Sequence, residues 1–295
     1  MPTLLHPDGD HFAFGRLTRR TLAAGVFGGY AAAGLWAEAD PIITDAAGLA
    51  TDTIRLPTEA GQIRAYVARP DAPGRFPAVI VVNEIFGLHA YILDVCRRFA
   101  RLGYVAVAPG FFDRAGDPAP LTDMAAIRKI VMTATDAQVM GDVGVTLTWL
   151  SAQPFVAARR IAITGFCWGG HVVWDACETF PQLRAGVSWY GQMAPPSGAP
   201  ADPSRIWPID HVADLRCPVL GLYGGKDPLS QAVPAMRAAL EGAGKTTSQI
   251  VVYDDAGHGF HADYRSSYNA ADAADGWKRL LAFFAANGAP PVSRP

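Results

Sequence analysis

The fold is decided by the stretch Ile161-Ala162-Ile163-Thr164-Gly165-Phe166-Cys167-Trp168-Gly169-Gly170, in which a strand-like run leads directly into a glycine-flanked cysteine. This stretch matches the pattern G-x-nucleophile-x-G, in which the nucleophile lies at the tip of a sharp turn between a strand and a helix. The flanking positions must approach other backbone closely, and Gly165 and Gly169 allow this because they lack a Cβ atom. Cys167 is therefore the candidate nucleophile. The alternative is a small buried cysteine in a glycine-rich turn.

On both sides of this stretch, apolar segments alternate with amphipathic ones. Residues 76–83 form a continuous apolar run, which is typical of a strand buried on both faces of a parallel sheet. Further strands are predicted at 53–57, 63–69, 104–109, 160–164, 185–190, 219–223 and 249–253, the first two as an antiparallel hairpin. Helices are predicted at 92–102, 124–132, 137–150, 171–178, 232–241 and 270–286. The alternation predicts an α/β fold with a mostly parallel central sheet and helices on both faces, in a single domain of residues 40–295.

Composition excludes several classes of function. The chain has 295 residues, is 50% hydrophobic and carries a formal net charge of −2. This balance gives no basic surface for nucleic acid or for an anionic membrane. The four cysteines show no CxxC spacing and lie near no histidine cluster, so we expect neither a metal site nor a cofactor.

The N-terminal segment has the features of an export signal. Arg19 and Arg20 precede a Gly- and Ala-rich apolar run that is too short for a stable membrane span, and Ala37-Glu38-Ala39 follows as a cleavage motif. Paired arginines are typical of the twin-arginine route. We therefore expect residues 1–39 to be removed on export to the periplasm. The alternative is an amphipathic tail on a cytoplasmic protein.

Two further residues complete a catalytic triad with Cys167. Asp227 follows the predicted strand 219–223, and His258 follows the predicted strand 249–253. In an open α/β sheet, working residues lie beyond the carboxyl ends of the strands, where all three candidates fall. Their order along the chain, nucleophile, acid, histidine, is that of the α/β-hydrolase fold. A histidine can take the thiol proton, and a carboxylate can orient the imidazole.

The segment after the 76–83 strand supplies the other half of the predicted site. α/β-Hydrolases place their second oxyanion donor there, so we expect the backbone N–H groups of Ile85 and Trp168 to form the oxyanion hole. Glu84 stands beside this position. Two interpretations are open for it: a group that regulates the thiol, or a surface or salt-bridged glutamate.

Four motifs together resemble the dienelactone hydrolase family (carboxymethylenebutenolidase-like proteins) over roughly residues 50–288. These are Asn83-Glu84-Ile85-Phe86-Gly87, Gly165-Phe166-Cys167-Trp168-Gly169-Gly170, Gly225-Lys226-Asp227 and the segment 258–265. The resemblance implies that Cys167, Asp227 and His258 form the triad. It also implies that Glu84 holds the resting thiol and swings away, or accepts its proton, as substrate enters. The substrate class implied is an enol-lactone or related activated ester, opened through an acyl-cysteine and then water.

One departure concerns the arginines that hold the substrate carboxylate in dienelactone-specific enzymes. One of these arginines lies four residues after the catalytic histidine, and the chain has Ala262 at that position. Arg265 lies three residues further on, and Arg114 and Arg128 are candidates for the other anchor. A missing bidentate clamp removes oriented recognition of a carboxylate. The sequence therefore leaves the particular lactone or ester open and does not single out dienelactone, whereas hydrolysis is the expected reaction.

Several side chains near the motifs are candidates for the substrate pocket or are interpreted as packing groups. Phe86, Tyr190 and Phe260 are expected to line the pocket. His171 and His261 have no partner at metal-ligand spacing, so packing or surface roles are favoured for both.

The sequence therefore predicts a cofactor-free cysteine hydrolase of a small-molecule lactone or ester. One alternative is an acyltransferase that passes the same acyl-cysteine to an acceptor other than water. Another is a small-molecule binding protein that has lost catalysis.

Overall fold

The computed structural model describes residues 41–196 and 205–292. Within these residues one eight-stranded sheet has the order β1-β2-β4-β3-β5-β6-β7-β8. The pairs β1–β2 and β2–β4 are antiparallel, and all other neighbouring strands run parallel. The prediction of a mostly parallel central sheet opened by an antiparallel hairpin is confirmed.

The strands are β1 Leu49–Thr58, β2 Gly61–Pro70, β3 Phe76–Val82, β4 Val105–Pro109, β5 Val156–Phe166, β6 Leu183–Trp189, β7 Val219–Gly224 and β8 Gln249–Tyr253. The helices are α2 Ala90–Arg101, α3 Met124–Val131, α4 Asp136–Ala152, α5 Trp168–Thr179, α6 Pro208–His211, α7 Val233–Gly242 and α8 Ala270–Ala286, with short 3₁₀ turns η1 Val212–Asp214 and η2 Pro228–Ala232.

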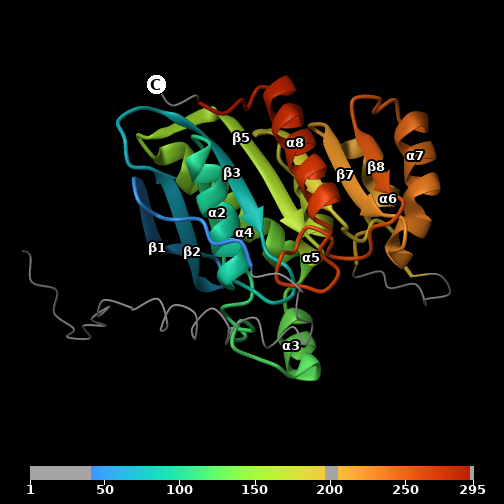
Figure 1. Cartoon of the computed structure of the whole chain (residues 1–295), viewed down its shortest axis with the longest axis horizontal. Helices are drawn as coiled ribbons and strands as arrows, with labels where there is room; N and C mark the ends of the chain where they lie inside the picture. Colours follow the sequence, from blue (N-terminus) through green and yellow to red (C-terminus); the bar gives the residue numbers. More distant parts are fainter. Residues whose placement is uncertain (1–40, 197–204, 293–295) are drawn as a thin grey trace, which may run out of the picture.

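Helices cover the sheet on both faces, as predicted, and each face has its own hydrophobic cluster. Apolar residues of α2 and α8 pack together on one face, and those of α4, α5 and α7 pack on the other. Figure 1 shows α2 and α8 in front of the strands, and α3 projecting from the body beyond the ends of the central strands. β3 and β4 are buried at every position, because helices exclude water from both of their faces.

The strand–turn–helix segment around Cys167, called the elbow below, differs from the sequence prediction in where its strand and its helix begin and end. β5 extends well beyond residues 160–164 at both ends, and α5 begins at Trp168, directly after Cys167. The sequence pattern places the helix start at His171 because Gly169 and Gly170 have low intrinsic helix propensity. Tertiary contacts override that propensity, since both glycines pack closely on neighbouring backbone. The turn is therefore as tight as the G-x-C-x-G pattern requires.

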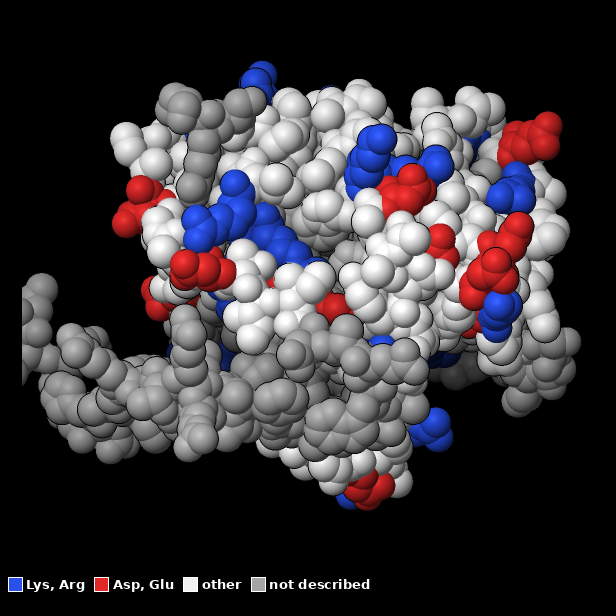
Figure 2. All heavy atoms as spheres, viewed as in Figure 1, with Lys and Arg blue, Asp and Glu red and all other residues white. Residues whose placement is uncertain are grey.

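The surface carries no single-sign field on the face seen in Figure 2, where basic and acidic side chains lie interspersed. This agrees with the formal net charge of −2. In the part of the chain that the structure describes, no helix is long and apolar enough to cross a membrane. The predicted export signal, residues 1–39, lies outside the described residues, as do residues 197–204 of the loop after β6.

Candidate active site

Cys167 stands at the tip of the turn between β5 and α5 with a strained backbone. Its φ is 56° and its ψ is −115°, a conformation that non-glycine residues rarely adopt. A Cβ atom at Gly165 would lie 2.2 Å from the carbonyl oxygen of Gly169, and one at Gly169 would lie 2.5 Å from that of Val82. The elbow therefore closes only because both flanking positions are glycine. Side-chain exposure also sets Cys167 apart, because it is partly exposed whereas the other three cysteines are buried and unpaired.

Two loops bring the acid and the histidine together. The backbone N–H of Gly225 donates to the carbonyl of Tyr253 at 2.7 Å, and that of Lys226 donates to the carbonyl of Ala256 at 2.9 Å. A Cβ atom at Gly224 would lie 2.5 Å from the carbonyl oxygen of Ala256. The loop after β7 thus packs directly on the loop after β8, and this contact aligns the two catalytic candidates.

The predicted acid and histidine form a short hydrogen bond. Nδ1–H of His258 donates to Oδ2 of Asp227 at 2.7 Å, and the N–H of Leu229 donates to Oδ1 of the same carboxylate at 3.0 Å. Burial of His258 lowers its pKa, but hydrogen bonds with Asp227 and with the Cys167 thiol outweigh burial and raise the pKa to about 10. The structure therefore brings the three predicted residues together in the order thiol, imidazole, carboxylate, and it favours the imidazolium.

The two predicted oxyanion donors come shortly after β3 and β5 in the chain. Trp168 is the first residue of α5, so its N–H has no acceptor within the helix. Its indole packs on Phe112, with 4.8 Å between ring centroids, which fixes the start of the helix. Ile85 follows β3 in the turn that the N–H of Gly87 closes on the carbonyl of Glu84. Their joint action on an oxyanion stays a prediction.

Glu84 is a fully buried carboxylate with three partners. Tyr264 donates its hydroxyl to Oε2 at 2.7 Å, and Nε2 of His89 lies 3.2 Å from the same oxygen. Nη1 of Arg265 lies 3.9 Å from Oε1. Burial raises the pKa of Glu84, but its hydrogen bond with His89, followed by the charges of His89 and Arg265, brings the net pKa below its ordinary value. Glu84 is therefore held as a carboxylate inside the protein.

None of the hydrogen bonds among the described residues joins Glu84 to the Cys167 thiol; those of Glu84 go to His89 and Tyr264. The predicted role of Glu84 in holding the resting thiol stays a prediction. Of the alternative, a surface or salt-bridged glutamate, burial excludes the surface position, whereas the contacts with His89 and Arg265 agree with a salt-bridged one. Sequence reasoning missed His89 and Tyr264. The available signal was their position, because both lie within the motifs or just beside them.

Tyr190 extends β6 toward the histidine. Its φ is 42°, again in the left-handed region, and its N–H donates to the carbonyl of Leu222 at 2.8 Å. Its ring centroid lies 5.1 Å from that of His258, and Phe260 packs behind it at 5.5 Å. Tyr190 and Phe260 have no exposed surface, and Phe86 packs edge-on against His89. A role for these three in lining the substrate pocket stays a prediction.

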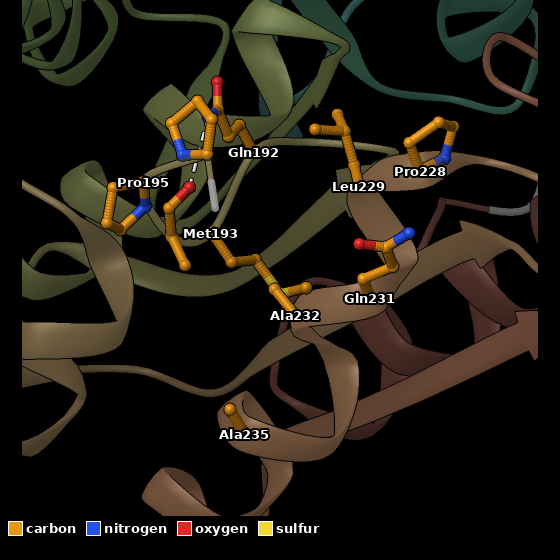
Figure 3. Close-up of a pocket in the computed structure, with 10 residues that line it drawn as sticks. Gln192, Met193, Pro195, Pro228, Leu229, Gln231, Ala232 and Ala235 are labelled. Carbon is orange, nitrogen blue, oxygen red and sulfur yellow. Dashed lines mark hydrogen bonds between the residues drawn. The ribbon is translucent and has the colours of Figure 1, made fainter. Parts of the chain in front are cut away.

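An open pocket of about 460 Å³ lies beside the acid. Figure 3 shows Gln192, Met193 and Pro195 on one side of it, and residues 228–235 on the other. Gly191, just before the first wall, packs against Gly170 of α5, and Pro228 in the second wall directly follows Asp227. The pocket therefore adjoins both the elbow and the acid loop. It is lined in part by the described residues of the loop after β6.

The three arginines considered as anchors for a substrate carboxylate have different surroundings in the structure. Arg114 binds Asp142 on α4 and Thr58 at the β-hairpin, and Arg128 is exposed on α3. Arg265 is the arginine that faces Glu84, and its charge also interacts with Cys167. The structure therefore does not support a substrate-anchoring role for Arg114, because its guanidinium already binds the carboxylate of Asp142.

His171 and His261 are packing groups, as favoured from the sequence. His171 is buried with its Nε2 3.2 Å from Asp175, and His261 is buried with its Nδ1 2.5 Å from the Tyr91 hydroxyl. Among the described residues, no group of three or more His, Cys, Asp or Glu side chains is arranged to hold a metal ion.

Comparison with known proteins matches this geometry to one family. Residues 63–288 match the sequence profile of the dienelactone hydrolase family. Relatives named "Putative carboxymethylenebutenolidase" include one from Methylorubrum extorquens, 45% identical over 249 residues (82% of this chain, 83% of the relative), and one from Salmonella typhimurium, 44% identical over 237 residues (79% and 86%). The crystal structure of a "Putative Dienelactone Hydrolase" from Klebsiella pneumoniae superposes with a TM-score of 0.75 at 44% identity, covering 80% of this chain and 98% of that one. The fold is accordingly the predicted α/β-hydrolase fold, and the chain belongs to the dienelactone hydrolase family, whose members are lactone and ester hydrolases.

Proposed function

We propose that the protein hydrolyses a lactone or a small activated ester through an acyl-cysteine, with Cys167 as nucleophile, His258 as proton carrier and Asp227 as its orienting carboxylate. The observation that carries the proposal is the 2.7 Å hydrogen bond from His258 to Asp227 beside a strained, partly exposed Cys167. Strain at a non-glycine residue is maintained only where the surrounding structure enforces it, and such residues cluster at functional sites.

The chemistry runs in two halves. The thiolate of Cys167 attacks the carbonyl carbon, and the tetrahedral oxyanion accepts hydrogen bonds from the N–H groups of Ile85 and Trp168. His258 then gives its proton to the departing alkoxide, which leaves an acyl-cysteine. In the second half, His258 takes a proton from water as the water attacks the acyl carbon. The resulting tetrahedral intermediate then collapses with cleavage of the C–S bond, which releases the carboxylic acid and restores the thiolate of Cys167 beside a protonated His258.

The test is removal of the nucleophile. Cys167→Ala should lower kcat for 4-nitrophenyl acetate and for an enol-lactone by at least about 10³-fold, because no other accessible thiol stands in the site. Intact-protein mass spectrometry during turnover should show a covalent acyl adduct on the wild-type chain and none on the variant.

The control is Cys217→Ala, which removes a buried thiol outside the site. It should keep activity and the adduct. Undiminished turnover by Cys167→Ala would refute the acyl-cysteine mechanism. Competing alcohols and amines, added during turnover, would reveal transfer rather than hydrolysis as ester or amide products.

A further inference from the structure

The cluster around Glu84 is built from three separate parts of the chain. Glu84 follows β3, His89 caps the N-terminus of α2, and Tyr264 and Arg265 lie in the loop that carries the catalytic histidine. All of these side chains except Arg265 are buried, and the Arg265 side chain is 15% exposed. The cluster therefore lies inside the protein, close to the nucleophile.

The backbone beside the catalytic histidine makes room for the arginine. Gly259 has a φ of +78°, and a Cβ atom there would lie 2.8 Å from Nη1 of Arg265. Glycine at this position thus both permits the turn and leaves space for the guanidinium. The loop is shaped to bring Arg265 to Glu84 and into electrostatic range of Cys167.

The guanidinium of Arg265 has a partner before any substrate arrives. The carboxylate of Glu84 accepts from the Tyr264 hydroxyl, and Nε2 of His89 lies 3.2 Å from the same oxygen. Nη1 of Arg265 lies 3.9 Å from the other oxygen, Oε1. Tyr190, which also faces the cluster, is neutral because burial raises the pKa of its phenol.

A second carboxylate brought into this site would itself be a buried charge without a free cationic partner in the Glu84 cluster. A buried charge is tolerated only when it is paired. The guanidinium that could pair with a substrate carboxylate already pairs with Glu84, and the position four residues after the catalytic histidine carries Ala262 in place of arginine. An uncharged ester or lactone brings no such cost.

We propose that His89, Tyr264 and Arg265 are positioning residues that hold Glu84 away from the Cys167 thiol. The site consequently takes uncharged lactones and esters in preference to substrates that carry a carboxylate near the scissile bond, and the thiol is available without a substrate carboxylate to release it. The preference rests on the proposed acyl-cysteine hydrolysis, whereas the positioning of Glu84 is tested without turnover.

The substrate preference is tested with two matched esters. Methyl 4-nitrophenyl succinate and mono-4-nitrophenyl succinate differ by a methyl group that masks the carboxylate. The wild-type chain should hydrolyse the neutral ester with kcat/KM at least about tenfold higher. Glu84→Gln, which frees the charge of Arg265, should lower that ratio about tenfold. The control His171→Gln, which breaks a second buried histidine–carboxylate contact of 3.2 Å, should leave the ratio unchanged.

The positioning of Glu84 is tested by thiol labelling. His89→Asn combined with Tyr264→Phe removes two donors from Glu84, so the carboxylate should turn to the thiol and slow carbamidomethylation of Cys167 by iodoacetamide about tenfold. Adding Glu84→Gln to this double variant should restore the labelling rate to that of Glu84→Gln alone. A merely structural defect would not be rescued.

The matched control for labelling is His171→Gln with Tyr253→Phe, because Tyr253 donates to Asp275 at 2.8 Å outside the site. It should label at the wild-type rate. An unslowed His89→Asn/Tyr264→Phe variant, or one that Glu84→Gln fails to rescue, would overturn the positioning role. A wild-type preference for the anionic ester that Arg265→Gln abolishes would overturn the substrate preference. Absence of Cys167-dependent turnover of either ester would instead refute the proposed function, and it would leave the labelling result intact.

Discussion

At the level of single residues, the site depends on where protons and charges reside at neutral pH. Hydrogen bonds with Asp227 and Cys167 raise the pKa of His258 to about 10 against the effect of burial. Elsewhere in the site, the hydrogen bond with His89 and the charges of His89 and Arg265 hold Glu84 as a carboxylate. The site thus keeps an imidazolium beside its thiol and a compensated anion behind it.

The raised pKa of His258 predicts an alkaline limit to activity. The imidazolium is needed to protonate the leaving group, so kcat/KM should hold below pH 10 and fall as pH rises through about 10. Asp227→Asn removes a contact that raises this pKa, so the alkaline limb should move toward lower pH by at least about one unit. Asp175→Asn, which removes the carboxylate beside His171, should leave the limb in place. A limb that is identical in wild type and Asp227→Asn would contradict this assignment.

At the level of elements, the elbow works because β5 and α5 meet with almost no space between them. Carbonyl oxygens of β3 and of α5 itself fill the positions that side chains at Gly165 and Gly169 would take. The neighbouring β6 is tied to the same turn, because the N–H of Cys167 donates to the carbonyl of Trp189 at 3.0 Å. The strain at Cys167 is therefore maintained by three strands and one helix together.

Alanine at the elbow should therefore be costly. Gly169→Ala would place a Cβ atom 2.5 Å from the carbonyl oxygen of Val82, and backbone cannot move aside as a side chain can. We expect a loss of about 3 kcal/mol in the free energy of unfolding by urea denaturation. The matched control is Gly141→Ala in α4, where a Cβ atom meets nothing within 4 Å. It should gain about 0.5–1 kcal/mol from helix propensity. If Gly169→Ala and Gly141→Ala have equal free energies of unfolding, a Cβ atom at position 169 does not clash with the carbonyl oxygen of Val82.

At the level of the whole molecule, one sheet places the candidate site residues together at one edge. The N-terminal end of the described chain packs on α2, which covers one face of this sheet. The N–H of Thr44 donates to Asp94 at 2.6 Å, and Arg97 donates to the carbonyl of Thr44 at 2.9 Å. Contacts with α2 therefore begin shortly after Ala39, the proposed cleavage position. Removal of residues 1–39 leaves these contacts in place.

We propose that the chain is exported by the twin-arginine route and cleaved after Ala39. A chain starting at residue 40 should melt within about 2 °C of the full-length chain, because none of the contacts of Thr44 is lost. Mass spectrometry of the periplasmic fraction should show a new N-terminus at Asp40, and Arg19→Lys with Arg20→Lys should abolish its appearance there. Full-length, unprocessed protein confined to the cytoplasm would refute export.

The sequence by itself determined the α/β architecture and the identity of the triad candidates. Continuous apolar runs such as 76–83 are typical of strands buried on both faces, and the glycines around Cys167 match the spacing of a tight strand–helix turn. Because the carboxyl ends of parallel strands lie at one edge of a sheet, Asp227 and His258 could be placed near Cys167 without coordinates. These features are local or periodic, so a linear pattern records them.

Only the tertiary structure decided which partner each polar side chain takes. His89, Tyr264 and Arg265 converge on Glu84 from distant parts of the chain, and no spacing in the sequence records that Arg114 is instead occupied by Asp142. The start of α5 at Trp168 was likewise missed, because close packing outweighs the low helix propensity of Gly169 and Gly170. Hydrogen bonds, burial and charge compensation depend on distances in space, so the candidate nucleophile follows from the sequence, whereas the electrostatic environment around it follows from the fold.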